Sequence, residues 1–130
     1  QIIDDYPMEL VSPVDWTDDS QNINDRVRSY LDVNCGHCHS PTGNANSTGL
    51  YLHLDETRDI HLGLYKKPVA TGRGSGGLKY SIVPGKPDES ILLHRMISLD
   101  PGVMMPESGR ALSHTEAVEM VREWILVMED

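Results

Sequence analysis

Apolar side chains recur at helical spacing in three segments of the chain. The first predicted helix runs from about Asp25 to Val33, after an asparagine cap at Asn22 or Asn24. Its predicted inner face follows the i, i+3, i+4, i+7 pattern of an amphipathic helix, with the apolar residues Val27, Tyr30 and Leu31 and with Asn34 at the i+7 position. We therefore expect one side of this helix to pack into the core.

Two further helices are predicted in the C-terminal half. One opens on residues 87–90, where proline and acidic residues suit a first turn, and ends near Asp100. Its apolar positions are Ile91, Leu92, Met96 and Ile97. The other runs from about His114 to Met128 after a capping box of Ser113 and Glu116. Its apolar stripe consists of Ala117, Met120, Val121, Trp124, Ile125 and Met128.

The segments between these helices are rich in turn residues. Residues 40–49 form a loop by their composition, residues 50–54 alternate in a way that allows a short extended piece, and residues 66–87 are mostly irregular. Residues 1–22 have no sustained period and predict an acidic arm or linker, followed by one domain over 23–130. The pattern predicts an all-α fold with loops long enough to wrap something.

The composition of the chain argues against a nucleic-acid-binding protein and against a membrane-spanning one. The chain has 130 residues, no Phe, and 20 acidic against 11 basic residues, which gives a net charge of -9. A basic nucleic-acid binder would show the opposite balance, and the apolar run 124–128 is far too short to cross a membrane. We expect no nucleic-acid partner and no membrane span. A core this poor in aromatic residues also suggests that something besides side chains fills the centre.

Both cysteines of the chain lie in one Cys-x-x-Cys-His motif, Cys35-Gly36-His37-Cys38-His39. This is the attachment signature of c-type haem. Two thiols three positions apart reach the two vinyl groups of one porphyrin, and the histidine that follows is held below the iron as an axial ligand. The motif predicts covalent haem at Cys35 and Cys38, with His39 bound to the iron.

Three other interpretations of the cysteine pair remain open. Cys-Gly-His-Cys also occurs in thiol–disulfide oxidoreductases, but there the motif follows a buried strand, whereas a charged helix precedes it here. A zinc site would need two histidines from His37, His39, His53 and His61 beside the cysteines, without the usual second paired spacing. A structural disulfide across a two-residue gap would be strained.

The chain resembles class I c-type cytochromes over about residues 24–128. The resemblance rests on the first helix, the Cys-x-x-Cys-His motif, a distant Met-Pro and the amphipathic C-terminal helix. Residues 84–96, Pro-Gly-Lys-Pro-Asp-Glu-Ser-Ile-Leu-Leu-His-Arg-Met, followed by Met104-Met105-Pro106, are similar to small bacterial periplasmic cytochrome c domains. The interval between His39 and Met105 is longer than in that family, so loop geometry cannot be carried over.

The resemblance implies a cytochrome c-like fold wrapped around one haem c, with methionine as the second axial ligand. Met105 matches the family's Met-Pro position and is preferred to Met104, while His94 and His61 are the histidine alternatives. A buried haem propionate needs a charged or multiply hydrogen-bonded partner. The basic candidates for this role are Arg73, Lys79 and Arg95.

These expectations describe a single-electron carrier or relay domain rather than an enzyme. The haem performs the redox chemistry, while the protein sets its potential and its access. Haem is attached to reduced thiols by export-side machinery, so we expect a periplasmic or exported protein. Its partner is a redox protein or an adjoining redox domain, and we expect the isolated domain to be a monomer.

Overall fold

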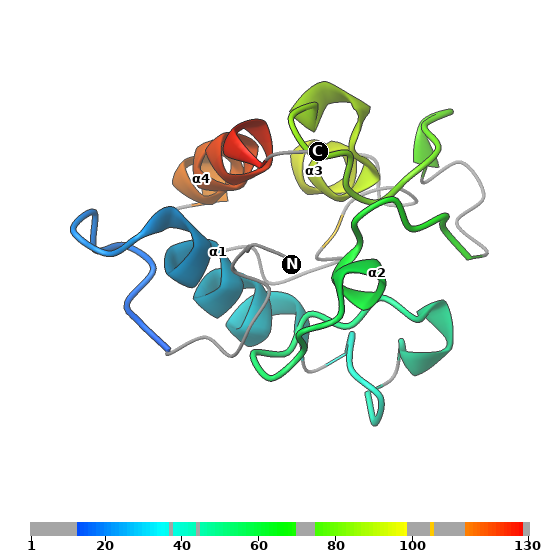
Figure 1. Cartoon of the computed structure of the whole chain (residues 1–130), viewed down its shortest axis with the longest axis horizontal. Coiled ribbons are helices and arrows are strands. Elements are labelled where there is room, and N and C mark those ends of the chain that lie inside the picture. Colours follow the sequence, from blue (N-terminus) through cyan, green and yellow to red (C-terminus); the bar gives the residue numbers. More distant parts are fainter. Residues whose placement is uncertain are drawn as a thin grey trace. The chain divides into compact units, whose positions relative to one another are not determined.

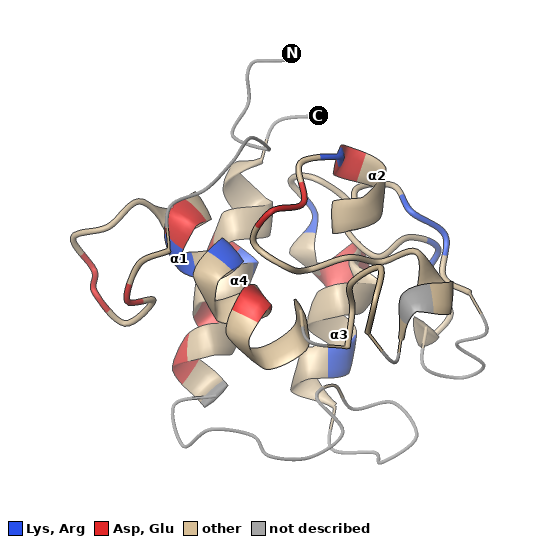
Figure 2. Cartoon of the chain, turned by 90° about the horizontal axis from the view of Figure 1, so that it is seen from below, with Lys and Arg blue, Asp and Glu red and all other residues tan. Residues whose placement is uncertain are grey.

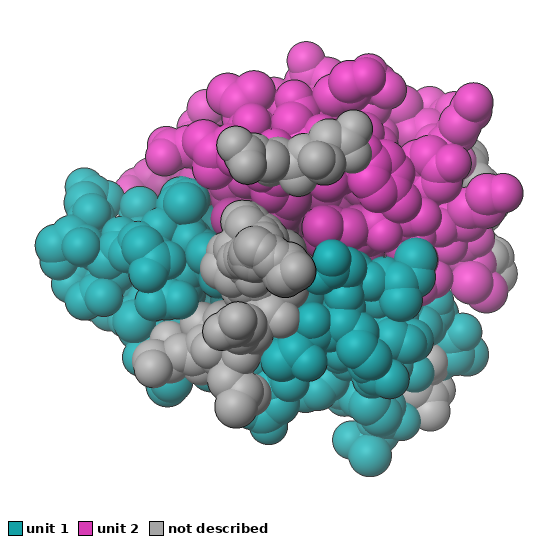
Figure 3. All heavy atoms as spheres, viewed as in Figure 1, with its two compact units in different colours: residues 1–62 teal, residues 63–130 magenta. Residues whose placement is uncertain are grey.

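A computed structural model describes residues 13–36, 38–43, 45–69, 75–98, 105 and 114–128. These residues form helices and turns without a β-strand, in agreement with the predicted all-α class (Figure 1). Extended pairing among them is confined to isolated bridges, Leu64 with Ile82 and Tyr80 with Ser90. The chain divides into two compact units, residues 1–62 and 63–130 (Figure 3). The predicted arm, residues 1–22, falls within the first unit.

The first predicted helix is α1 (Ile23–Leu31). Of the two cap candidates, Asn22 takes the role, because its side-chain oxygen accepts a 2.8 Å hydrogen bond from the backbone N–H of Asp25. Val27, Tyr30 and Leu31 are buried as predicted. The helix then continues into a π-helical turn, η1 (Asp32–Gly36), which carries Cys35. The first cysteine is thus fixed to the end of α1 without an intervening loop.

The described part of the predicted arm packs against α1. The backbone N–H of Val14 donates to Ser29 Oγ at 3.0 Å, and the ring of Trp16 meets that of Tyr30 edge to face, with centroids 5.0 Å apart. Arg26 Nε donates to the carbonyl of Trp16 at 2.9 Å. In Figure 2 the acidic residues of this stretch are coloured red on the loop before α1. Residues 13–22 therefore extend the packing of the helix.

Between the cysteine motif and the end of the first unit lie a 3-10 turn, η2 (Asn46–Thr48), and a single-turn helix, α2 (Asp59–Leu62). The sequence did not predict α2, because four residues are too few to show a helical period. Residues 50–54 form no strand. Instead, the Tyr51 N–H donates to the carbonyl of His61, and the Leu52 N–H donates to that of His39, both at 2.7 Å. Residues 51 and 52 thus connect α2 with the cysteine motif through backbone hydrogen bonds.

The second unit contains a 3-10 turn, η4 (Pro87–Glu89), followed by α3 (Ile91–Ile97) and α4 (His114–Val127). The predicted start at Pro87 holds for the turn, but Ser90 has extended backbone, so the α-helix begins at Ile91. The buried face also differs from the predicted one: Leu93 enters the core, Leu92 is half-buried, and Ile97 is 49% exposed. The predicted face, which included Leu92 and Ile97, was wrong at these positions.

The predicted apolar stripe of α4 is confirmed. All six of its members are buried, namely Ala117, Met120, Val121, Trp124, Ile125 and Met128. α4 packs against α3 and η4, and Arg122 Nη1 pairs with Asp88 Oδ1 at 3.0 Å across that contact. Within the described ranges, no helix is both long and apolar enough to cross a membrane.

Candidate functional site

The cysteine motif forms one tight turn at the end of α1. The backbone N–H groups of Cys38 and His39 both donate to the carbonyl of Cys35, at 3.2 and 2.8 Å. His37 lies outside the described residues. The turn holds Cys35, Cys38 and His39 together, as the sequence predicted, so three potential cofactor-binding side chains extend from five consecutive residues.

Both cysteines are free thiols and half-buried. Desolvation raises the pKa of the Cys35 thiol to about 12, and the neighbouring Cys38 adds to the rise. A neutral thiol is a poor nucleophile in disulfide exchange, because the thiolate is the reactive species. Among the described residues, burial rather than a nearby positive charge governs the pKa of Cys35, whereas a positive charge activates the first cysteine of a thiol–disulfide oxidoreductase.

The ring of His39 is oriented through its Nδ1 atom. Nδ1 lies 3.2 Å from the carbonyl oxygen of Leu50, with Thr48 Oγ1 at 3.4 Å. Because a carbonyl oxygen can only accept, this contact favours the tautomer of the neutral ring that carries its hydrogen on Nδ1. Metal-binding histidines have this same arrangement, in which a backbone carbonyl fixes the tautomer and the other nitrogen binds.

Gly36 lets the turn approach the chain segment that holds His39. A Cβ atom built at Gly36 would lie 3.0 Å from the Cα of His53 and 3.1 Å from its backbone nitrogen. These are rigid backbone atoms, so a larger residue would push the segment away from the turn. The glycine inside the motif therefore fits a close contact of two backbones.

His61 is held in nearly the same way as His39. Its Nδ1 lies 2.7 Å from the carbonyl oxygen of Gly49, and its ring stacks on Tyr51 with centroids 4.8 Å apart. Two histidines on opposite sides of one metal direct their Nδ1–H groups away from each other. The carbonyls of Gly49 and Leu50 belong to residues only ~3.8 Å apart. Because these two carbonyls are so close together, the Nδ1 atoms of His39 and His61 that contact them are close together as well. The two histidines therefore cannot be opposite ligands of a single iron.

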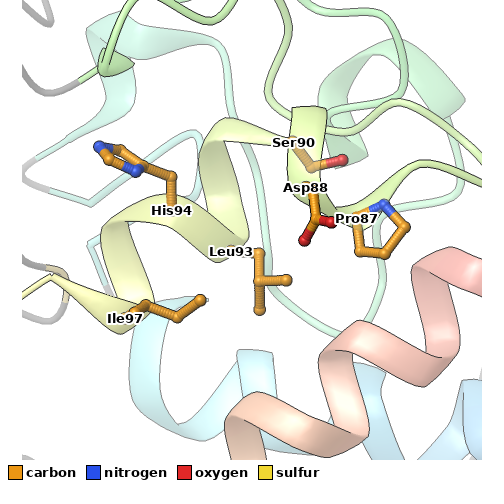
Figure 4. A pocket seen from close by; sticks show the side chains of 6 residues that line it. All are labelled: Pro87, Asp88, Ser90, Leu93, His94 and Ile97. Atoms are coloured by element: carbon orange, nitrogen blue, oxygen red, sulfur yellow. The ribbon is translucent and has the colours of Figure 1, made fainter.

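His94 lies on α3, at the edge of a small hollow that is open to solvent. Figure 4 shows its ring pointing away from Leu93; the other residues around the hollow are Pro87, Asp88, Ser90 and Ile97. A Cβ built on Gly76, which has φ +59, would lie 2.5 Å from His94 Nε2. The Nε2 edge of the ring thus faces Gly76, where a residue with a side chain would collide with it.

The other predicted site residues belong to the second unit. The backbone N–H of Met105 donates to the carbonyl of Arg95 at 2.8 Å, so the C-terminal end of α3 holds the methionine. Arg95 is half-buried and Lys79 is exposed. Arg73 and Met104 lie outside the described residues.

Sequence reasoning missed the residues that support the motif from α1. Arg28 is completely buried and donates to backbone carbonyls of residues 53–56, and Asp32 accepts from the N–H of Leu54. The sequence offered one indication of this role: Arg28 is a charged residue that directly follows Val27 and lies three positions before Leu31, at helical spacing from the apolar face. Thr48 was also missed, because its contact with His39 depends on how the loop folds back.

Nowhere in the described ranges do three or more His, Cys, Asp or Glu side chains gather in a way that could hold a metal ion. The zinc interpretation of the cysteine pair thus gains no support from them. Comparisons of the chain with protein-family models, with curated proteins and with solved structures found no match. The functional argument rests on the residues themselves.

Proposed function

We propose that this chain binds one haem c covalently at Cys35 and Cys38, with His39 as an axial ligand, and transfers single electrons. The observation that carries the proposal is the hydrogen bond from His39 Nδ1 to Leu50 O. This contact places the ring hydrogen on Nδ1, the tautomer that a histidine bound through Nε2 needs, at the one histidine that directly follows a Cys-x-x-Cys pair. The proposal includes a cytochrome c-like fold for the domain.

The side chains of the turn have separate roles in this proposal. Cys35 and Cys38 would each hold the haem through a thioether bond to one of its two vinyl groups. His39 binds through Nε2, while Leu50 and Thr48 hold its Nδ1 side. When bound, the haem supplies the iron couple that gains and loses the electron.

Met105 is the sixth ligand in this proposal. A thioether suits an iron that must be stable in both oxidation states, and methionine with histidine raises the potential. The contact of His61 Nδ1 with the carbonyl of Gly49 supports this choice over His61, and His94 stays the histidine alternative. Arg73, Lys79 and Arg95 remain the candidates for pairing with the propionates.

The thiol–disulfide oxidoreductase alternative has less support. An attacking cysteine works best when its pKa lies near the ambient pH, and the pKa of Cys35 is raised to about 12. We also propose that the protein works in the periplasm or outside the cell, with a redox protein or an adjoining redox domain as its partner.

The test is to produce the chain in a host that exports it and attaches haem c. We expect a red protein with one haem per chain, retained under denaturing conditions, and sharp bands in the reduced-minus-oxidised spectrum. A matched Cys35→Ser, Cys38→Ser variant should lose the covalent haem. A colourless wild-type protein with a titratable dithiol would overturn the proposal and favour the oxidoreductase.

A further inference from the structure

Arg28 is the most deeply buried charged residue of the described chain, with 0% of its surface exposed. Its Nη2 atom donates to the carbonyl of Glu56 at 2.6 Å and to that of Leu54 at 3.1 Å, and the carbonyl of His53 lies at 3.5 Å. A buried guanidinium that binds backbone carbonyls fixes the path of that backbone, because losing those bonds would leave both groups unsatisfied. Arg28 thus ties residues 53–56 to α1.

Asp32, one helical turn after Arg28, binds a backbone N–H group of the same segment, whereas Arg28 binds its carbonyls. Its Oδ1 accepts from the N–H of Leu54 at 2.8 Å. Leu54 is therefore fixed at its N–H by Asp32 and at its carbonyl by Arg28. We call Arg28 and Asp32 the α1 clamp.

The clamped segment continues directly into the residues that hold His39. Leu52, two positions before Leu54, donates its N–H to the carbonyl of His39 at 2.7 Å. Leu50, two positions earlier, supplies the carbonyl that lies 3.2 Å from His39 Nδ1. Residues 50 and 52 thus contact both the ring and the backbone of His39. The same segment is bonded to α1 through Arg28 and Asp32.

We propose that Arg28 is a positioning residue for the axial histidine: through segment 50–56 it sets the hydrogen bond between Leu50 O and His39 Nδ1, and with it the redox potential. This inference rests on the proposed function. A stronger bond at Nδ1 makes the imidazole a more basic ligand, which favours the oxidised iron. Loosening the clamp should weaken that bond and raise the potential.

The positive charge of Arg28 also affects the redox potential, and its removal would change the potential in the opposite direction to loosening the clamp. Its Nε and Nη1 atoms are buried without a hydrogen-bond partner among the described residues, and the nearby Glu56 carboxylate is engaged by Arg58. Removing this positive charge would favour oxidised iron and lower the potential. The informative variant is therefore Arg28→Lys, which keeps the charge but has a shorter side chain, so its ammonium does not reach the position of Nη2, the atom that donates to these carbonyls.

The experiment compares the haem-loaded wild type with Arg28→Lys and with Arg26→Lys, a matched control on the same helix whose guanidinium bonds Trp16 and Asp19 instead. We expect Arg28→Lys to raise the midpoint potential and to speed exchange of the His39 Nδ1 proton in NMR of the reduced protein. Arg26→Lys should change neither. Unchanged potential and exchange in Arg28→Lys would overturn the inference while leaving electron transfer intact.

A second pair of variants keeps the inference testable if Arg28→Lys does not fold. Asp32→Asn and Asp32→Ala lose the same charge, but only asparagine keeps an oxygen that can accept from Leu54. The inference requires a higher potential in the alanine variant than in the asparagine variant, and equal potentials would contradict it. A wild-type chain without haem would overturn the proposed function and this inference together.

Discussion

At the scale of single residues, Met105 is the proposed ligand whose role depends most on its sequence neighbours. Pro106 fixes its own φ and biases Met105 towards extended backbone, and the Met105 N–H is bonded to Arg95. Adjacent side chains of an extended segment point in opposite directions, so Met104 and Met105 cannot both reach one iron.

We predict that Met105→Ala abolishes the weak near-infrared band of sulfur bonded to ferric iron and lowers the midpoint potential. The matched Met104→Ala variant should keep the band and cost only packing, about 2–4 kcal/mol if that side chain is in the core. Near-infrared spectra of the two oxidised variants check this. The reverse pattern would assign the ligand to Met104.

Glu56 is the carboxyl whose ionisation contributes most clearly to stability. Arg58 donates to it from Nε at 2.8 Å and from Nη2 at 2.9 Å, and the backbone N–H of Arg58 adds a third bond. The hydrogen bonds from Arg58 lower the pKa of Glu56 from its usual 4.5 to about 2, against the opposing effect of burial. The carboxylate itself is buried, while Arg58 is exposed.

We predict that this carboxylate stabilises the fold above its unfolded-state pKa, and that the contribution is lost as pH falls from about 4.5 towards 2. The loss is at most about 3 kcal/mol, reduced by solvent screening around Arg58. Urea unfolding at several pH values in this window should show a flatter pH dependence for Glu56→Gln than for the wild type. An exposed control, Glu89→Gln, should follow the wild type.

At the scale of elements, the junction between α1 and η1 decides where the cysteines lie. α1 passes into the π-helical turn at Asp32, and Gly36 closes that turn against the backbone of His53. π-helical turns are rare and concentrate at functional sites. The position of α1 therefore fixes the position of the cysteines that we propose as the haem attachment sites.

We predict that Gly36→Ala destabilises the haem-loaded protein by about 1–3 kcal/mol, because the added Cβ would come within 3.0 to 3.2 Å of backbone atoms of Leu52 and His53 and force that segment to shift. It should also lower the ratio of haem to protein after export. Chemical denaturation and the haem absorbance measure the two effects. Val33→Ala is the control, since Val33 is 72% exposed and three residues away; it should stay within about 0.5 kcal/mol of wild type.

At the scale of the whole molecule, long irregular segments join a few short helices. α2, α3 and the 3-10 turns span at most seven residues each, and the chain has no Phe to fill its centre. A porphyrin would offer large apolar faces for the helices to cover, so burial of the cofactor should supply much of the driving force for folding.

We predict that the Cys35→Ala, Cys38→Ala variant is largely unfolded. Circular dichroism and calorimetry should show weak helicity and no cooperative transition. The wild-type chain made without haem attachment should be unfolded to the same extent. Because this chain keeps both cysteines, the comparison shows whether the loss of haem or the loss of the thiols causes the unfolding. A native-like cooperative melt in either protein would show that the chain folds without the cofactor.

The sequence by itself predicted the features that depend on local spacing. The stripe of α4 from Ala117 to Met128, the buried face of α1 and the all-α class follow from the 3.6-residue period, since a helix places such residues on one side. The grouping of Cys35, Cys38 and His39 is equally local, because five consecutive residues in one turn cannot separate.

Only the tertiary structure decided which residues support that turn. The choice of Asn22 over Asn24, the shift of the buried face in α3 and the helix α2 depend on where each backbone segment begins and ends. The partners of His39 and of Arg28 lie 9 to 28 positions away in sequence. No periodic pattern records such contacts, because they arise when a loop folds back and its carbonyls need donors.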